Sequence, residues 1–288
     1  MLEASELILN ADNSIYHLNL LPEDIADTII IVGDQNRVPE VSKHFDSIEV
    51  KKEKREFVTH TGVLKGKRIT ALSTGIGADN IDIVINELDA LANIDFKTRK
   101  IKKKPKQLKI IRIGTSGAIQ KDIPVDSFVM SEYALGFDGV LHFYKHEGIC
   151  DEAFSEAFVK HTDWSDKKPW PYLVPCDASL RETLASNRIR YGVTLTNSGF
   201  YGPQGRKLRL DVQDPSLNDK IANFKYGDLR ITNLEMESSA IYGLCKLLGH
   251  QALSMNCIIA NRVLGEFSEN PRKTINSLIA YTLDRLTR

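Results

Sequence analysis

Short apolar runs alternate along this chain with segments whose apolar residues recur at helical spacing. Runs rich in Ile, Val and Leu that end at Gly or polar residues are typical of buried strands. We expect strands at Thr28–Val32, Arg68–Ser73, Lys109–Ile113, Ser127–Ser131, Gly192–Thr196 and Ala252–Ala260, and helices at Asn80–Ala92, Leu234–Leu248 and Arg272–Leu286. This alternation predicts an α/β fold, a single domain over residues 1–288 with a central mixed, largely parallel β-sheet flanked by helices.

The composition is that of a globular protein without a strong overall charge. Of the 288 residues, 42% are hydrophobic, which is enough to bury a sizeable core. Basic and acidic residues both number 38, so any anion site has to be local. The chain has no membrane-spanning apolar stretch and no Cys-x-x-Cys pair, and its acidic first residues predict no secretion signal. We therefore expect a cytoplasmic protein whose partners are neither membranes nor nucleic acids.

One arginine stands inside an apolar run. Ile110 and Ile111 precede Arg112, and the segment Gly114-Thr115-Ser116-Gly117 follows it. A buried guanidinium is costly unless its charge is met, and a turn of Gly, Thr and Ser offers N–H and hydroxyl groups to an anion. We expect the strand to end in such a turn, and we expect the turn and Arg112 together to bind an anion, most simply phosphate. The alternative is a buried arginine that pairs with a carboxylate beside an ordinary turn.

Two further segments carry arginines in a similar context. Gly33 follows the first predicted strand directly and Arg37 comes one turn later, whereas Arg55 precedes an acidic and an aromatic residue. Guanidinium groups suit the oxygens of phosphate because they donate two parallel hydrogen bonds. Neither segment is specific alone, but the set favours a phosphate site.

The basic run Lys97–Lys109 is the one oddity of composition. It predicts either a solvated loop between a helix and a strand or a patch that binds nucleic acid. The run contains no aromatic residue, and no other basic stripe supports it. The loop is the favoured interpretation, and a nucleoside- or RNA-binding protein that uses this run is the non-enzymatic alternative.

These motifs together resemble those of the nucleoside phosphorylase-I family over nearly the whole chain. The matching segments are Tyr16-His17-Leu18, Val32-Gly33-Asp34 with Arg37, Arg55-Glu56-Phe57, Ser73-Thr74-Gly75-Ile76-Gly77, Arg112 to Gln120, Gly192-Val193-Thr194, Phe200 to Arg206 and Asn233 to Ser238. Within the family the chain is most similar to the branch that cleaves uridine. The resemblance implies a pentosyltransferase that converts uridine, or deoxyuridine, and phosphate reversibly to uracil and a pentose 1-phosphate in pyrimidine salvage.

The resemblance also implies roles for individual residues. Phosphate would be held by Gly33, Arg37, Arg112 and Thr115, and by Arg55 from a neighbouring subunit. The ribose would be held by Met236 and Glu237, and by His17 from the neighbour. The base would be bound by Gly117, Phe200, Gln204 and Arg206. Catalysis would fall to Arg112, Gln204, Arg206 and Arg262, the last assisting the leaving group.

Shared sites of this kind imply a homo-oligomer, with a dimer as the minimum unit and a hexamer as the expected assembly. The resemblance implies no cofactor, with inorganic phosphate as co-substrate. Related bacterial enzymes bind potassium between subunits. Glu56 and Ile76 match that site, whereas Asn80 stands where those enzymes have Ser, so the chain departs from the potassium site at this position.

Base choice separates the rivals within the family. Purine enzymes carry an Asp near the end of the strand that follows the Glu-Met-Glu helix, and this chain has Asn261 there. The amide of Gln204 has a donor and an acceptor, which suits the edge of uracil. The alternatives are a purine nucleoside phosphorylase and a nucleosidase that uses water, and three phosphate-facing arginines argue against the nucleosidase.

Overall fold

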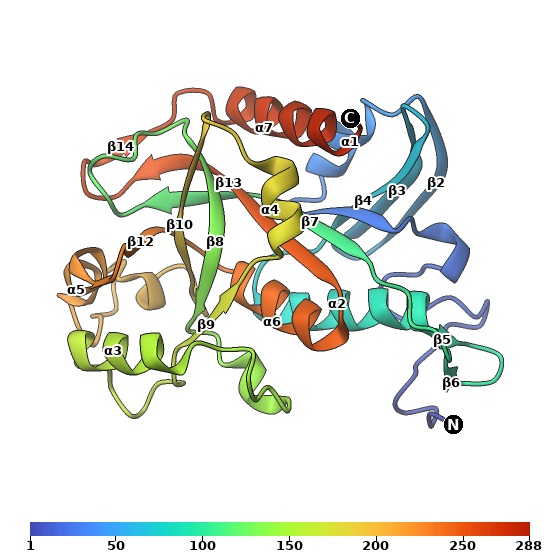
Figure 1. Ribbon diagram of the computed structural model, residues 1–288, viewed down its shortest axis with the longest axis horizontal. Coiled ribbons are helices and arrows are strands. Elements are labelled where there is room, and N and C mark those ends of the chain that lie inside the picture. The colour runs from blue at the N-terminus through green and yellow to red at the C-terminus, as the bar shows by residue number, and fades with distance from the viewer.

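The computed structural model describes residues 1–288 and contains one large mixed β-sheet. Figure 1 shows the sheet crossing the molecule between two layers of helices. The strand order is β11-β12-β10-β8-β13-β7-β1-β4-β3-β2, with β9 on β8 and β14 on β13. Parallel pairings join β4, β1, β7 and β13, and they also join β8, β10 and β12. The predicted fold class is confirmed.

The long strands cover most of the predicted runs and extend several of them. They are β1 (Thr28–Val32), β2 (Ser47–Lys54), β3 (Phe57–Leu64), β4 (Lys67–Ser73), β7 (Lys109–Ala118), β8 (Phe128–Gly136), β10 (Ile189–Thr196), β12 (Leu229–Glu235) and β13 (Gln251–Asn261). The short strands are β5 (Ile94–Asp95), β6 (Lys100–Ile101), β9 (Tyr172–Pro175), β11 (Lys225–Tyr226) and β14 (Glu266–Phe267).

One pairing closes part of the sheet into a ring. The end of β12 pairs antiparallel with the end of β7, where Asn233 lies opposite Ala118. Because β12, β10, β8, β13 and β7 are neighbours in that order, this contact returns the sheet to its own centre. The carboxyl ends of β7 and β12 are therefore brought together.

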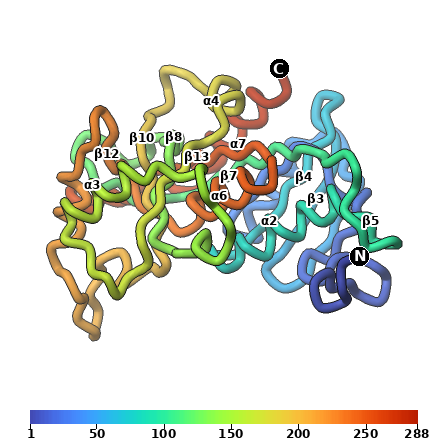
Figure 2. Tube along the Cα trace, turned by 60° about the horizontal axis from the view of Figure 1, so that its bottom comes forward, coloured from blue at the N-terminus to red at the C-terminus, as the bar shows by residue number.

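The helices lie on both sides of the sheet. On one side α2 (Ala78–Asn93) packs against α6 (Ser238–Leu248), and on the other α7 (Pro271–Leu286) packs against α1 (Arg37–Ser42) and α4 (Ala178–Leu184). The remaining helices are α3 (Glu152–Thr162), α5 (Leu217–Asn223) and the single turns η1 (Pro22–Asp24), η2 (Val140–Phe143) and η3 (Gly202–Gln204). Figure 2 shows α3 and β12 at one end of the molecule, and the N-terminus and β3 at the other.

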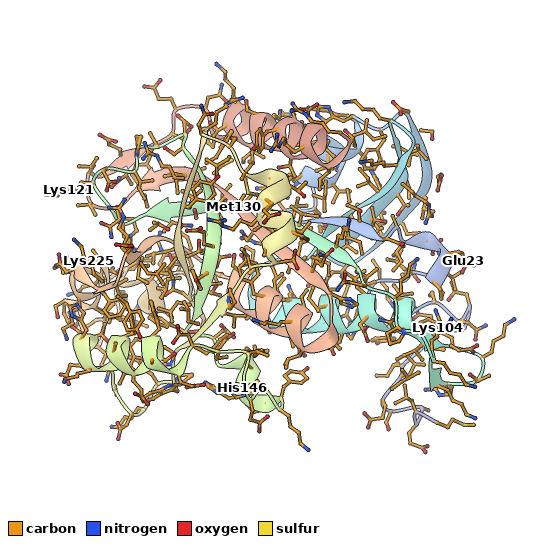
Figure 3. The ribbon with its side chains drawn as sticks, viewed as in Figure 1. Glu23, Lys104, Lys121, Met130, His146 and Lys225 are labelled. Atoms are coloured by element: carbon orange, nitrogen blue, oxygen red, sulfur yellow. The ribbon has the colours of Figure 1, made fainter.

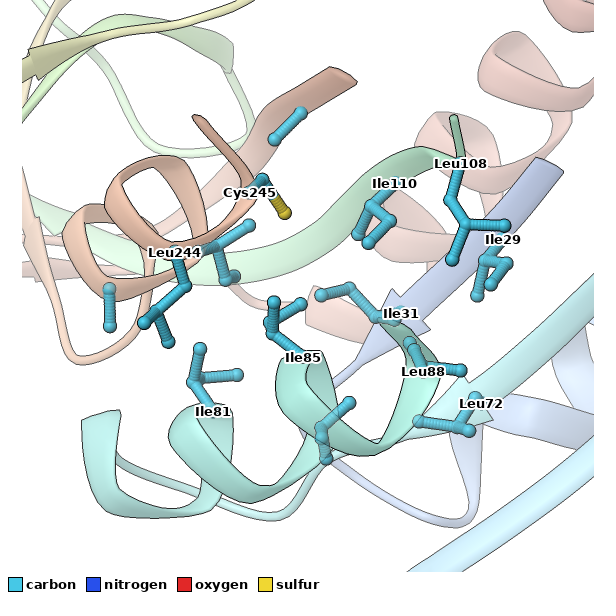
Figure 4. Close-up of a cluster of buried hydrophobic side chains, with 14 of the residues drawn as sticks. Ile29, Ile31, Leu72, Ile81, Ile85, Leu88, Leu108, Ile110, Leu244 and Cys245 are labelled. Atoms are coloured by element: carbon cyan, nitrogen blue, oxygen red, sulfur yellow. The ribbon is translucent and has the colours of Figure 1, made fainter. Parts of the chain in front are cut away.

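The apolar face of α2 accounts for much of the core. Ile81, Ile85 and Leu88 recur at helical spacing and are almost completely buried. They face β1 and β7, which contribute Ile31 and Ile110 (Figure 4). This packing fixes the start of α2 beside the ends of those strands. None of the helices combines the length and the apolar character needed to cross a membrane.

Two sequence predictions about element ends were wrong. The segment 114–117 is not a turn, because β13 pairs with β7 up to Ala118 and holds it in the sheet. The helix predicted from Leu234 begins only at Ser238, because Leu234 and Glu235 belong to β12 and pair with β10. In both places a distant strand determines where the element ends, which local periodicity cannot show.

The basic run Lys97–Lys109 is mostly exposed and lies between α2 and β7, as the loop interpretation predicted. The backbone NH of Leu2 donates to the carbonyl of Arg99, and the Arg99 side chain donates to the carbonyls of Leu2, Glu3 and Leu7. Lys106 forms an ion pair with Asp27. Lys104 lies at the edge of the molecule (Figure 3). The prediction of one domain over 1–288 stays a prediction.

Candidate active site

Arg112 lies in the middle of β7 with β1 on one side and β13 on the other. Its guanidinium runs along the strand toward Gly114, where a Cβ would lie only 1.9 Å from Nη1. No real side chain fits at that distance, so glycine is required at 114 if Arg112 is to lie this way. The glycine that sequence analysis assigned to a turn instead makes room for a buried cation.

Four side chains hold the Arg112 guanidinium. Nη1 donates to Asn256 Oδ1 at 2.8 Å and to Ser254 Oγ at 3.4 Å. Nη2 donates to Glu237 Oε2 at 2.5 Å and lies 3.2 Å from Glu235 Oε2. The alternative of a buried arginine paired with a carboxylate is therefore present in the structure, with two carboxylates. Burial lowers the pKa of Arg112, but the charges of Glu235 and Glu237 outweigh burial and raise it overall.

The two carboxylates have different surroundings. Glu235 Oε2 accepts from the backbone NH groups of Glu237 and Ser238 at 3.0 Å, and Oε1 accepts from Thr196 Oγ1 at 2.6 Å. Glu235 thus binds the free NH groups at the start of α6. Burial raises its pKa, whereas the charge of Arg112 opposes the rise. Both carboxylate oxygens of Glu235 are fully engaged in bonds to the protein. Glu235 therefore supports the structure of the site and has no acceptor position left for a ligand.

Glu237 keeps capacity for a ligand. Its Oε1 accepts from the backbone NH of Gly77 at 2.9 Å, at the start of α2, and its Oε2 takes the Arg112 bond. A carboxylate offers about four acceptor positions, so two remain. Met236, the residue before it, is half-buried.

A second guanidinium lies beside the first. β1 ends at Val32, so the edge of β7 beyond Arg112 is uncovered on that side. Arg37, at the start of α1, donates to the Ile113 carbonyl there at 3.1 Å. Burial, followed by the charge of Arg112, lowers the pKa of Arg37. Two cations that repel each other beside the carboxyl end of β1 are suited to an anion.

Thr115 is half-buried on the same strand. Gly33 is also half-buried, and a Cβ at Gly33 would make only ordinary contact, 3.5 Å from the Gly75 carbonyl. Within this chain, packing around Gly33 does not require a glycine.

The predicted base-binding residues form a second cluster. Arg206 Nη1 donates to Gln204 Oε1 at 2.6 Å and to the Phe200 carbonyl at 2.7 Å. The Arg206 guanidinium lies 3.8 Å from the centre of the Phe200 ring, close enough for cation–π attraction. Gln204 is 3% exposed, whereas the Phe200 ring is half exposed. The cluster thus combines a buried amide with a half-exposed aromatic ring that carries the Arg206 guanidinium over one face.

Arg262 connects this cluster to β7. It donates to the Gln204 carbonyl at 2.5 Å, and its backbone NH donates to the Ala118 carbonyl at 2.9 Å. Its side chain passes over Gly117, where a Cβ would be 3.6 Å from Cγ. Burial and then the charge of Arg206 lower the pKa of Arg262 to about 10, so it stays protonated at neutral pH.

Asn261 is committed to the backbone. Its Nδ2 donates to the carbonyls of Gln120 and Ile123 at 2.9 and 2.8 Å, and its Oδ1 accepts from the NH groups of Val263 and Leu264. All four bonds hold neighbouring loops in place. No donor of Asn261 is left for a base.

His17 and Arg55, which the resemblance expects to act in the site of a neighbouring subunit, make no hydrogen bonds to either cluster. His17 Nδ1 lies 2.6 Å from Glu87 Oε1, and that carboxylate also accepts from the NH groups of His17 and Leu18. Arg55 forms the tip of the β2–β3 hairpin and is exposed. Neither His17 nor Arg55 bonds to a residue of the Arg112 or Gln204 clusters.

The predicted potassium ligands surround Gly75. A Cβ at Gly75 would meet Asn80 Nδ2 at 2.4 Å and Glu56 Cγ at 3.0 Å. Asn80 Nδ2 also donates to the Ile76 carbonyl at 3.4 Å. These three residues offer oxygen donors of the kind a hard cation takes, but a cation at the Ile76 carbonyl has to displace that amide.

Sequence reasoning missed the residues that support the site. Asn256 and Ser254 on β13 hold Arg112, Glu235 caps α6, and Glu87 binds the His17 segment. Glu235 stood inside the predicted helix Leu234–Leu248, so its place before the start of α6 was not visible in the sequence. For Asn256 and Glu87 the contacts span 144 and 70 residues of chain, and no local pattern marks them.

The fold and the site define an α/β protein whose buried arginines and carboxylates meet at the ends of its parallel strands. The model of the phosphorylase superfamily matches residues 27–283. Uridine phosphorylase of Thermococcus kodakarensis is 30% identical over 269 residues, covering 90% of this chain and 81% of that protein. The DeoD-type purine nucleoside phosphorylase of Oceanobacillus iheyensis is 26% identical over 276 residues, covering 94% and 99%.

A crystal structure of the Trypanosoma brucei nucleoside phosphorylase, described as showing uridine phosphorylase activity, matches with a TM-score of 0.87. It is 27% identical to this chain and covers 97% of it and 99% of itself. The chain therefore belongs to the phosphorylase superfamily, and the family predicted from its motifs is confirmed.

Proposed function

We propose that this chain is a pentosyltransferase that catalyses the reversible phosphorolysis of uridine to uracil and ribose 1-phosphate, in pyrimidine salvage. The observation that carries the proposal is the pairing of two clusters along β7. Arg112 with Glu237 lies at one position, and Gln204 with Arg206 lies near the strand's end. The uridine phosphorylases of Thermococcus kodakarensis and Haemophilus influenzae, at 30% and 26% identity, support the same activity.

Phosphate fits the first cluster on grounds of charge. Arg37 and Arg112 carry two positive charges, and Glu235 with Glu237 carry two negative ones when ionised, so the buried part of the site is close to neutral. A phosphate dianion needs more positive charge, which Arg55 of a neighbouring subunit would supply. Gly33 and Thr115 would contact the remaining oxygens.

The ribose would lie against Met236, with its hydroxyls donating to the free acceptor positions of Glu237. Phosphate held below C1′ would stabilise the positive charge that grows on the sugar as the C1′–N1 bond lengthens. A phosphate oxygen then forms the new bond to C1′, and the electron pair of the broken bond leaves with the base. Positioning and fixed charges supply the catalysis, without a covalent intermediate on the protein.

The uracil would stack on Phe200 above Gly117. Gln204 would bind its polar edge through the amide, and Arg206 would donate to a carbonyl that gains negative charge. Arg262, protonated at neutral pH, would further stabilise the departing anion. The Arg206 bond to Gln204 Oε1 fixes the amide orientation, so the Gln204 NH₂ group is free to donate.

A purine nucleoside phosphorylase is the second candidate, since relatives such as the Oceanobacillus iheyensis protein carry that name. The state of Asn261 argues against it. Its amide is consumed by four backbone bonds and offers no proton to a purine nitrogen. A nucleosidase would use the same kind of site but would cleave the nucleoside with water in place of phosphate. Two adjacent guanidinium groups argue against this alternative, because they are suited to binding an anion.

The working form would be a homo-oligomer, a dimer at least and a hexamer in the fuller assembly, located in the cytoplasm. His17 and Arg55 would each enter the site of a neighbour. Potassium at Glu56, Ile76 and Asn80 would lie close to that junction, because Glu56 directly follows Arg55. Inorganic phosphate would be the only co-substrate, with no organic cofactor.

The test is release of free base from uridine, cytidine, inosine and adenosine, each with and without phosphate. We expect phosphate-dependent uracil release, with uridine preferred over the purine nucleosides by ~10⁴ or more, because a wrong base leaves buried polar groups unpaired. Inosine used as well as uridine would contradict the base assignment. Equal release without phosphate would contradict phosphorolysis.

A further inference from the structure

The peptide unit between Tyr16 and His17 is held at both ends by other parts of the chain. Its carbonyl oxygen accepts from Lys54 Nζ, and its NH donates to Glu87 Oε1 at 3.0 Å. Lys54 is the last residue of β2, and Glu87 lies on α2. The segment that carries His17 has no regular secondary structure of its own beyond an isolated bridge, so these contacts determine where it lies.

Lys54 makes more contacts than a surface lysine usually does. Besides the Tyr16 carbonyl, Nζ donates to Asn10 Oδ1 at 3.0 Å and lies 4.4 Å from the centre of the Tyr16 ring. Asn10 in turn donates to the Ile15 carbonyl at 2.9 Å. The ammonium group thus gathers the 10–16 segment around itself.

The residue after Lys54 is Arg55, in a two-residue turn between the paired residues Lys54 and Phe57. Arg55 has a φ of 57°, a left-handed conformation that favours glycine or asparagine. A non-glycine residue in this region costs on the order of 1 kcal/mol. The guanidinium of Arg55 and the Nε2 of His17 have no partner within the chain.

We propose that Lys54 is a positioning residue that joins His17 and Arg55 into one unit, so that both reach a neighbour's site together. This inference rests on the proposed function. Lys54 is covalently next to Arg55 and bonded to the peptide group next to His17. Any displacement of the hairpin tip is therefore passed on to the His17 segment, and the phosphate and ribose contacts of the neighbour become linked.

Lys52 provides a matched control on the same strand. It lies two residues earlier, and its Nζ donates to Asp24 Oδ2 at 2.6 Å, so it also ties β2 to the N-terminal region. Asp24 follows His17 by seven residues and lies in η1, beyond the segment that carries His17. Lys52→Met therefore removes another ammonium contact between β2 and the N-terminal region, in this case an ion pair, without touching the Tyr16–His17 peptide.

The experiment compares Lys54→Met, Lys54→Arg and Lys52→Met in the full-length protein. The readouts are uridine phosphorolysis with each substrate varied and the melting temperature. We expect Lys54→Met to lower kcat/KM for uridine and for phosphate together, about 10- to 100-fold, as small misplacements of contacting groups do. Lys54→Arg should recover most of the loss. Lys52→Met should melt at a similar temperature to Lys54→Met and keep near-normal kinetics.

A second comparison separates positioning from general damage. Lys54→Met is introduced into a protein that already carries His17→Ala and Arg55→Ala. If Lys54 acts through those two residues, its replacement should change the residual activity less than twofold. A full loss in that background, or kinetics of Lys54→Met equal to those of Lys52→Met, would overturn the positioning role. A wild-type protein that releases no uracil from uridine would overturn the proposed function itself. The positioning role of Lys54, which rests on that function, would then be overturned as well.

Discussion

Replacing Arg112 by alanine should affect stability and activity at once, and the structure indicates how to separate the two. The side chain is buried and bonded to Glu235, Glu237, Asn256 and Ser254. Its removal leaves two carboxylates, 4% and 5% exposed, without the cation that is bonded to both. Breaking a buried pair in this way costs roughly 3–5 kcal/mol, a large part of a typical total stability of about 5–15 kcal/mol.

The stability loss should depend on pH in a defined direction. Burial and the charge of Glu237 already raise the pKa of Glu235 from its ordinary 4.5, and the charge of Arg112 opposes the rise more than the hydrogen bonds from Thr196 and the Glu237 backbone do. Without Arg112 the pKa of Glu235 rises further. A carboxyl group whose folded-state pKa is raised stabilises the fold at low pH and loses that contribution as pH rises through the folded value. The deficit of Arg112→Ala relative to wild type should therefore grow as pH rises through and above the raised folded-state pKa that Glu235 has in the wild type.

Urea unfolding of wild type and Arg112→Ala at pH 5 and pH 8 measures this effect, and Arg112→Ala/Glu237→Gln is the control. The control lacks one of the facing carboxylates, so it should recover stability without recovering activity. Phosphorolysis should fall on the order of 100-fold or more in both variants. A variant with wild-type stability at pH 8 and an unchanged phosphate KM would refute the placement of Arg112 between carboxylates and phosphate.

Three further substitutions test other parts of the site. Gly114→Ala should abolish most activity while costing about 1–3 kcal/mol of stability, because its Cβ would lie 1.9 Å from Arg112 Nη1; phosphate KM and urea unfolding measure both, and wild-type kinetics would contradict the contact. Gln204→Ala should raise the uridine KM and lower kcat with little change in phosphate KM, and an effect on phosphate alone would misplace the base. Asn261→Asp should gain no inosine phosphorolysis and should melt at a lower temperature, because a carboxylate would face the carbonyls of Gln120 and Ile123; new inosine activity would show that Asn261 is free to contact the base.

The sequence predicted which segments form strands and helices better than it predicted where those elements begin and end. β1 and the region of α2 follow from β-branched runs and helical spacing, and both lie where predicted. The end of β7 could not be predicted, because β13 holds it in the sheet from more than 100 residues away along the chain. The start of α6 could not be predicted either, because β10 holds Leu234 and Glu235 in β12 from 39 residues away. Hydrophobic periodicity reflects only residues that are close in the sequence, whereas strand pairing depends on residues that are close in space.

The site divides in the same way. Arg112, Gln204 and Arg206 were predicted from their motifs. The structure bonds Arg112 to Glu237 and Arg206 to Gln204, and the roles of these residues stay predictions. Lys54, Glu87 and Asn256 were missed because ordinary polar residues acquire their importance only from a distant partner. Gly114 was found but misinterpreted, since its absent side chain serves Arg112 and not a turn.

The ring formed by β12, β10, β8, β13 and β7 has a consequence for how the protein acquires its activity during synthesis. Arg112 and Glu237 are 125 residues apart along the chain, and Asn256 is 144 residues from Arg112. Contacts of such high sequence separation form slowly, because long loops must close first. The site can therefore be assembled only after β13 has left the ribosome. We expect recovery of enzyme activity to be among the last events of refolding. The helices and strands of the half of the sheet that contains β1 to β4 should form earlier.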